Sequence, residues 1–419
     1  MTQRETHHVN GQRNIFCRGV GTLMEVSLCA FLLCNMRRFC LCLTVLVFLP
    51  AVPARAEGDW EITADSALAL DRGLAWLANN QGPDGNWSSN DLGLVSLGAL
   101  AFLADGHAPG RGRYGAVVQR ALNYVIENAK PNGLLNISNS QRDMYNHGLA
   151  TFVLGQAHGT MTQPGASLHR ALDRGLRVIR DTQCEDGGWD YRVRRQARGH
   201  DLSLVVMQAK ALRSASDSGL QVPPEVVQAA IACVFEYYAP KDGTQAASTD
   251  AQQESPGQFA YSKGGGGETI AMAAAGVVCL QEFGIYDDWR IAKNMAVIHA
   301  AIDELPPARR DGTLPFDAYT LYYASQAIYQ RGDKSWADHY GKLRDYLVQS
   351  QMLAPGDSTM HGSWRDNGAN GGGKVGGRPG ALFGTAVACF TLAIPNRYLP
   401  ILQAGRASEF NQPDSGNRR

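Results

Sequence analysis

The sequence predicts an all-α protein: an α/α toroid, or α6/α6 barrel, built from six helical-hairpin repeats. Two observations support this prediction. A Gln–Gly–aromatic segment follows amphipathic helical runs at regular intervals, and a second, more apolar helical run follows each of these segments. A long internal repeat indicates an array of supersecondary units, so it outweighs the two or three domains that 419 residues would otherwise suggest. No strand-like alternation interrupts the pattern, which argues against a parallel α/β fold.

The repeated segment is clearest in "QCEDGGWDY", where Gln183, Gly187 and Trp189 follow the amphipathic run "LHRALDRGLRVIRDT". "QGPDGNW" repeats this spacing and ends at Trp87, and a version with a longer turn ends at Trp364. Three degenerate copies end at positions 135, 261 and 316, so the copies recur roughly every fifty residues. We expect the glutamine to satisfy carbonyls at the end of its helix, the glycine to adopt positive φ, and the tryptophan to be a structural staple under the neighbouring repeat.

The second helix of each repeat differs in composition from the first. These runs are rich in Ala, Gly and Ser and carry few charges; they are "NDLGLVSLGALAFLADG", "NHGLATFVLGQAHG", "HDLSLVVMQAKALRSA", "ETIAMAAAGVVCLQEFG", "FDAYTLYYASQAIYQRG" and "ALFGTAVACFTLAIPN". An amphipathic helix suits an outer ring with one solvated face, whereas a helix that is apolar all round suits a buried inner ring. Six such hairpins can close one toroid over residues 57–404.

The N-terminal region carries a different signal. Residues 36–56, "MRRFCLCLTVLVFLPAVPARA", combine a basic start, a short apolar run and an Ala-x-Ala end, which is the pattern of a secretory signal peptide. We therefore expect export, to the periplasm or the medium, of a mature chain that begins at Glu57. An uncleaved segment would act as a membrane anchor and allow peripheral membrane contact. Residues 1–35 are predicted to be unstructured or a mis-assigned start, and residues 405–419 a disordered tail.

Charge and cysteine content narrow the partners. The formal net charge is zero, so nothing in the composition favours nucleic acid as a partner. The cysteines of the mature chain are far apart and have no paired spacing, so we expect neither zinc nor any other metal or cofactor. These cysteines are Cys184, Cys233, Cys279 and Cys389. Cys279 and Cys389 lie in apolar helical runs and are predicted to be buried free thiols.

The Q-x-x-x-G-x-W segment, repeated with apolar helices between its copies, resembles the QW repeat of the terpenoid cyclase and protein prenyltransferase superfamily, as found in squalene-cyclase-like proteins. The resemblance covers residues 66–396. It implies a toroid whose central cavity holds an isoprenoid chain.

The catalytic motifs of that superfamily are not reproduced. No D-x-D-D-type acid motif occurs, and Tyr319 stands where the zinc-binding Asp-x-Cys of prenyltransferases, here beginning at Asp317, has its thiolate. The next inner helix also has no histidine. "NHGLATF", from Asn146, resembles the H-G-G-Y-T-F segment whose histidine contacts a diphosphate, which implies that role for His147. However, His147 and Asp317 lie three repeats apart, so the joint arrangement is missing.

The starts of the inner helices are predicted to gather at one rim of the barrel, where polar side chains would surround an apolar cavity. The candidate catalytic residues are His147, His200, Asp201, Glu268 and Asp317. The candidate ligand-binding residues are Asp91, Asn146, Arg192, Lys263 and Tyr319. A histidine can transfer protons near neutral pH, and an arginine beside a helix N-terminus can bind an anion. The acids also suit N-caps, the arginine also suits a solvated loop, and Lys263 lies in a glycine-rich stretch predicted to be a flap.

Three functional hypotheses remain open. In the first, the exported toroid binds an isoprenoid or other apolar small molecule and transforms it. In the second, it is a non-catalytic binding or scaffold protein. In the third, it is a carbohydrate-active enzyme in which Asp201, Glu268 and Asp317 supply paired carboxylates. The QW-like repeat argues against the third hypothesis, and the sequence leaves open whether the protein is an enzyme.

Overall fold

The computed structural model describes residues 60–137, 143–161, 165–241, 249–354, 359–366 and 380–403. All of them lie in one compact unit, Ala56–Arg419. Residues 1–59 and 404–419 lie outside the described ranges. The signal peptide, the early start and the C-terminal tail therefore stay predictions.

The described chain is almost entirely helical and alternates between two kinds of helix. The outer helices are α2 (Ala64–Asn80), α4 (Gly115–Glu127), α6 (Ala166–Asp181), α8 (Pro224–Phe235), α11 (Trp289–Asp303) and α13 (Asp333–Ser350). The inner helices are α3 (Leu92–Ala104), α5 (Asp143–Gly159), α7 (Leu202–Asp217), α10 (Ile270–Glu282), α12 (Ala318–Arg331) and α14 (Gly380–Ala393). The predicted all-α toroid is thus confirmed.

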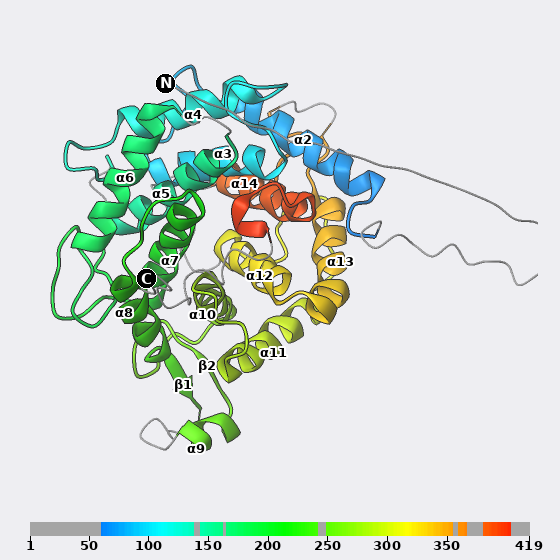
Figure 1. Cartoon of the computed structure of the whole chain (residues 1–419). Helices are drawn as coiled ribbons and strands as arrows, with labels where there is room; N and C mark the ends of the chain where they lie inside the picture. Colours follow the sequence, from blue (N-terminus) through cyan, green and yellow to red (C-terminus); the bar gives the residue numbers. More distant parts are fainter. Residues whose placement is uncertain are drawn as a thin grey trace, which may run out of the picture. The chain divides into compact units, whose positions relative to one another are not determined.

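The inner helices close a ring. Each packs against the next in the order α3, α5, α7, α10, α12 and α14, and α14 packs against α3 (Figure 1). Each outer helix packs against the inner helix that precedes it in the chain, while the first helix, α2, packs against α13 and α14. Every residue of α3 is buried, whereas α6 buries one face only. Burial therefore follows the composition of the two helix types.

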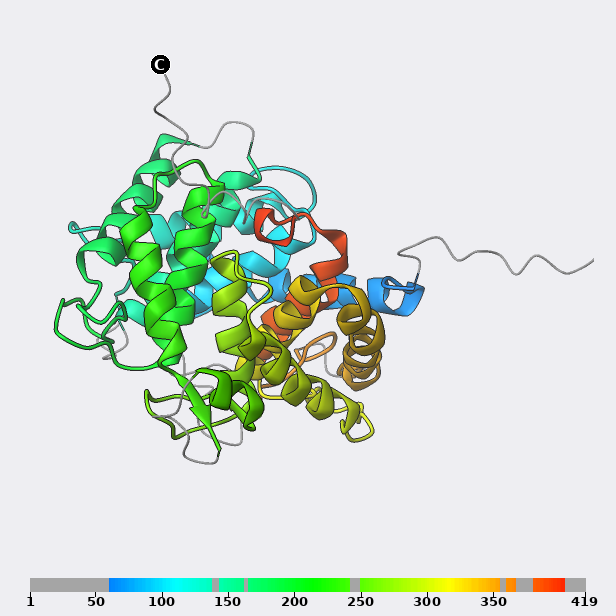
Figure 2. The ribbon, with the colours of Figure 1, turned by 60° about the horizontal axis from the view of Figure 1, so that its bottom comes forward.

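A small β-hairpin interrupts the helical pattern. β1 (Tyr238–Pro240) pairs antiparallel with β2 (Gly257–Phe259), and the short helix α9 (Thr249–Glu254) lies between them in the sequence. Both views place this segment outside the ring of inner helices (Figure 1, Figure 2). Two 3₁₀ turns, η2 (Ile394–Asn396) and η3 (Pro400–Leu402), follow α14. The hairpin could not be predicted from the sequence, because three-residue strands are too short to show an alternating pattern.

The three strict Gln–Gly–Trp segments share one tryptophan geometry. In each, the indole Nε1 donates to a backbone carbonyl four residues before the glutamine. The bonds run from Trp87 to Leu77 (2.7 Å), from Trp189 to Ile179 (2.8 Å) and from Trp364 to Leu347 (3.0 Å). All three tryptophans are buried. Each indole thus bonds to the last turn of the helix before it, which supports the predicted role as a structural staple. The Leu347 carbonyl also accepts the Gln351 N–H (3.1 Å), so Trp364 adds a second bond there.

The glutamines do something other than predicted. Gln183 Nε2 donates to the Gly187 carbonyl in its own turn (3.0 Å) and to the Val226 carbonyl at the start of α8 (2.9 Å). The equivalent bonds to the next outer helix run from Gln81 to Val117 (2.9 Å) and from Gln351 to Ala69 (2.8 Å). The expectation that glutamine serves its own helix end was wrong. The backbone is already extended at Gln81 and Gln351, so the side chain leaves its helix and links two repeats.

A buried polar layer fills the barrel toward the C-terminal ends of the inner helices. Lys210 Nζ donates to Glu282 Oε1 (3.0 Å) and to Gln326 Oε1, and it lies 4.5 Å from the ring centroid of Phe152. The side chains of Lys210 and Glu282 are completely buried. Burial lowers the pKa of Lys210, an effect that the nearby Glu282 carboxylate opposes. This layer joins α5, α7, α10 and α12 at the centre of the barrel.

The cysteines within the described ranges are all free and buried, as predicted for Cys279 and Cys389.

Candidate functional site

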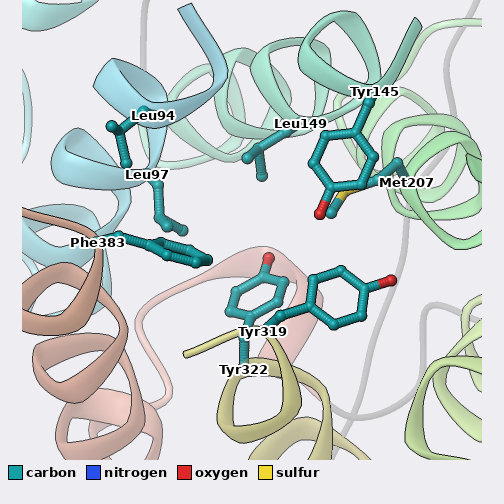
Figure 3. A pocket seen from close by; sticks show the side chains of 8 residues that line it. All are labelled: Leu94, Leu97, Tyr145, Leu149, Met207, Tyr319, Tyr322 and Phe383. Carbon is teal, nitrogen blue, oxygen red and sulfur yellow. The ribbon is translucent and has the colours of Figure 1, made fainter. Parts of the chain in front are cut away.

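A cavity lies between the N-terminal halves of the inner helices. Its lining residues are Leu94 and Leu97 of α3, Tyr145 and Leu149 of α5, Met207 of α7, Tyr319 and Tyr322 of α12, and Phe383 of α14. Their side chains surround a common space (Figure 3). The pairs on α3, α5 and α12 are three or four residues apart, which is the spacing that puts two side chains on one helix face. Every inner helix except α10 contributes to this lining.

The cavity is narrow. Between the lining side chains, about 10 Å³ is wide enough for the centre of a water molecule. The rings of Tyr322 and Phe383 project into the space (Figure 3). Any molecule larger than a single water therefore requires lining side chains to turn aside.

Asp201 organises the rim of the barrel at the start of α7. Its Oδ1 accepts hydrogen bonds from the Leu204 N–H (3.3 Å) and the Ser203 hydroxyl (2.5 Å), and its Oδ2 accepts from His200 Nδ1 (2.8 Å). Asp201 is completely buried, whereas the side chain of His200 is 52% exposed. The pair thus connects a buried carboxylate to solvent.

Two tyrosines complete this rim cluster. The hydroxyls of Tyr191 and Tyr261 lie 2.8 Å apart, and the Tyr191 ring packs edge-on against His200. Burial, together with the negative charge of Asp201, raises the pKa of both phenols, so they stay protonated and able to donate. The charge of Asp201 also helps to raise the pKa of Tyr319, after the larger effects of burial and Tyr145. The charge of Asp201 in this rim cluster (His200, Asp201, Tyr191 and Tyr261) therefore acts on a side chain that lines the cavity.

Sequence reasoning missed most of these positions. Tyr191 and Tyr261 belong to the repeated turns, where they had been assigned no chemical role. The cavity residues lie in the N-terminal halves of the inner helices, in pairs at helical spacing. The sequence shows that spacing, but the candidates were chosen mainly among polar side chains.

Asp91 and Asn146 form a second buried pair at the rim. Asp91 caps α3 by accepting from the Leu94 N–H (3.0 Å), and its Oδ2 accepts from Asn146 Nδ2 (3.0 Å). Both residues are buried. The bond between them ties the start of α3 to the start of α5, so the predicted capping role holds for Asp91.

Four further candidates lie apart from these contacts. Lys263 is 2.7 Å from both Asp186 and Glu236 in a surface crevice. Burial acts to lower its pKa, but these carboxylates outweigh it and raise the pKa. The other three candidates face solvent and bond to nearby residues. The Arg192 backbone N–H donates to Asp190, and Glu268 accepts from the Gly266 N–H. Asp317 caps α12 by accepting from the backbone N–H and the hydroxyl of Thr320. Among the ten candidates, hydrogen bonds join Asp91 with Asn146 and His200 with Asp201. The proposal of a single polar ring therefore stays a prediction.

His147 lies away from the cavity lining and is completely buried. Its Nδ1 accepts from the Leu135 N–H (3.0 Å) and its Nε2 donates to the Gly175 carbonyl (3.0 Å). These partners require the neutral ring with its proton on Nε2, and burial lowers the pKa to about 4. The placement favours a structural role for His147, bridging the turn before α5 to α6.

The pH dependence of stability should report this burial. Because the folded pKa of His147 (about 4) lies below its ordinary value of 6.5, only the unfolded chain takes up this proton between those two values. The contribution of neutral His147 to the free energy of unfolding is present above pH 6.5. It is lost as the pH falls toward 4, by up to about 3 kcal/mol. Urea unfolding across this range should show the loss.

The matched variant is His147→Gln, whose amide offers one acceptor and one donor but does not titrate. We expect it to be less stable than the wild type at neutral pH and to have a shallower slope, by about one proton, between pH 6.5 and 4. His299 is half-buried and its pKa is also lowered to about 4, but it contributes equally to both proteins and cancels in the difference. Equal slopes of unfolding free energy against pH in the two proteins would contradict the assignment of a neutral, buried ring to His147.

The described residues contain no cluster of three His, Cys, Asp or Glu side chains arranged to hold a metal ion. In that same part of the chain, no helix combines the length and apolarity needed to cross a bilayer.

Comparison with known proteins gives similarity at the level of structure only. No family model matches the sequence, and no curated protein matches it. A protein from Actinoplanes is similar in structure with a TM-score of 0.47 and 15% identity, covering 79% of this chain and 98% of that chain. The type II terpene cyclase MstE from Scytonema gives a TM-score of 0.32 and 13% identity, covering 80% and 99%. A variant of that cyclase in complex with geranylgeranyl dihydroxybenzoate gives 0.30 and 14%, covering 80% and 98%.

These likenesses are too low to assign an activity or a ligand. The helical toroid rests on the structure of this chain itself, and membership of the terpenoid cyclase and prenyltransferase superfamily stays a prediction.

Proposed function

We propose that the protein binds an isoprenoid or another apolar small molecule in the central cavity. The observation that carries this proposal is the lining: aliphatic and aromatic side chains from five inner helices converge at one end of the barrel. Apolar pockets with a few polar groups at their mouth are the usual form of small-molecule sites. Asp201, His200, Tyr191 and Tyr261 supply the polar groups here.

Where the bound molecule is transformed, we assign proton transfer to Asp201 and His200. His200 is exposed enough to exchange protons with solvent, and its 2.8 Å contact with Asp201 leads to a buried carboxylate. The Tyr191 and Tyr261 phenols stay protonated beside that carboxylate and can stabilise its charge. Export of the chain from Glu57 is part of the proposal, and N-terminal sequencing of the mature protein tests it.

A non-catalytic binding toroid is the second candidate. It is favoured by the hydrogen bonds of Asp91, Asp201 and Asp317, each of which caps its own inner helix. The carbohydrate hypothesis is weakened because Glu268 and Asp317 face solvent and bond within their own segments, whereas Asp201 is buried. Turnover that disappears in Asp201→Asn would exclude the second candidate.

Native mass spectrometry with lipid extraction, on protein starting at Glu57, tests the proposal. We expect a co-purifying apolar molecule, or binding of added squalene or a prenyl diphosphate. Leu149→Trp should fill the cavity and weaken binding by about tenfold or more. Leu68→Trp adds the same indole at an exposed position of α2 and should leave binding unchanged.

Circular dichroism checks that both variants are folded. The proposal fails if the wild type carries and binds nothing apolar, or if folded Leu149→Trp binds as tightly as Leu68→Trp does.

A further inference from the structure

The hydroxyl of Tyr322 has an unusual environment. Tyr322 is 3% exposed and lines the cavity, and its hydroxyl points into the space bordered by Leu97, Leu149 and Phe383 (Figure 3). Within the described ranges this hydroxyl has no hydrogen-bond partner. The hydroxyl of Tyr319, which also lines the cavity, has none there either. The Tyr319 hydroxyl points away from the space between Leu97, Leu149 and Phe383, so Tyr322 supplies the donor that faces it (Figure 3).

The nearby polar side chains are already engaged. The Gln326 amide donates to the Tyr322 backbone carbonyl (2.6 Å), and its oxygen accepts from Lys210. The Tyr323 hydroxyl, on the next residue of α12, donates to Met207 Sδ (3.4 Å). The Gln326 side chain also lowers the pKa of the Tyr322 phenol, against the larger effect of burial, so it acts there as a donor and does not accept the phenol's proton.

A buried hydroxyl without a partner destabilises the folded state, and native proteins contain few of them. Burial raises the pKa of Tyr322 well above its ordinary value, so the phenol keeps its proton and remains a donor. A water molecule would need two or more polar partners, and the cavity offers about 10 Å³ for its centre, the lower limit for holding one. An acceptor on a bound molecule would satisfy the phenol directly.

We propose that the cavity selects an apolar molecule that carries a hydrogen-bond acceptor, such as an ether, carbonyl or hydroxyl oxygen, and that Tyr322 donates to this oxygen. The inference rests on the proposed function and specifies the chemical class of its ligand. A pure hydrocarbon would fill the space but leave the Tyr322 phenol unpaired.

Three probes with the same fifteen-carbon skeleton test the inference: farnesene has no oxygen, farnesol has a hydroxyl, and farnesyl methyl ether has an acceptor only. Titration followed by tryptophan fluorescence gives the dissociation constants. We expect Tyr322→Phe to weaken binding of the alcohol and the ether by about fivefold to tenfold, and to leave farnesene unchanged or bound more tightly. Tyr323→Phe, which removes a hydroxyl outside the lining, should leave the ratios between probes unchanged.

The possible outcomes are distinct. Equal weakening of all three probes by Tyr322→Phe, or weakening of none, overturns this inference and leaves the proposed function standing. No binding of any probe to the wild type removes both.

A second measurement needs no ligand. Because the Tyr322 hydroxyl has no partner to lose, Tyr322→Phe should leave the equilibrium constant for unfolding unchanged or lower it. A rise of about tenfold would mean that the hydroxyl is paired inside the protein, which would overturn the inference.

Discussion

Replacing Lys210 with methionine is expected to lower the free energy of unfolding by about 3 to 5 kcal/mol, because it leaves the Glu282 carboxylate buried without its closest cation. Methionine keeps most of the side-chain volume, so the loss would come from charge rather than from a void. Denaturant unfolding at neutral pH measures the difference.

The double variant Lys210→Met/Glu282→Gln is the matched control. It removes both charges, and Gln330 can still donate to the side-chain oxygen at position 282, as it does in the wild type (3.2 Å). We expect it to recover most of the lost stability, because a buried pair that is removed together costs far less than a pair that is broken. If Lys210→Met alone stays within about 1 kcal/mol of the wild type, the ion pair is not the main support of this layer.

Gly187→Ala is expected to lower the free energy of unfolding by about 3 kcal/mol or more. Gly187 has φ of +81°, which disfavours any side chain, and an added Cβ would lie 2.0 Å from the Ala229 carbonyl oxygen of α8. The turn after α6 would therefore have to move away from α8. Gln183 bridges the same two segments, so its bond to Val226 should be lost as well.

Gly219→Ala separates the two causes of the lower stability, which are backbone strain at positive φ and the clash of the added Cβ with α8. Gly219 has nearly the same φ, +82°, but an added Cβ would meet nothing within 4 Å. We expect it to cost about 1 to 2 kcal/mol, from backbone strain alone. Similar thermal unfolding of the two variants would show that close packing between the turn and α8 contributes little.

The fold could be predicted because its signals are local. The spacing of Gln183, Gly187 and Trp189 and the contrast between charged and apolar helices each occupy a short stretch of chain. Glycine was assigned correctly, since positive φ is a property of one residue: Gly85, Gly187 and Gly362 all adopt it. The glutamine was assigned wrongly because its second acceptor belongs to the next outer helix.

The candidate site could be predicted only in part, since its contacts join distant segments. Tyr191 meets Tyr261 across 70 residues and Lys210 meets Glu282 across 72. Polar residues at inner helix starts were found, but equal position along a helix does not give equal orientation. Asp201 is buried against His200, while Glu268 and Asp317 face solvent.

By itself, the sequence determined a six-hairpin helical toroid, its turns, and which helices are inside, because periodicity and composition decide which face a helix buries. The tertiary structure alone decided how narrow the cavity is and which side chains line it. Ring closure brings α12 and α7 together, which places Tyr322 above Lys210 and leaves one phenol facing an apolar space. No local pattern encodes that arrangement, because it depends on how all the inner helices pack at once.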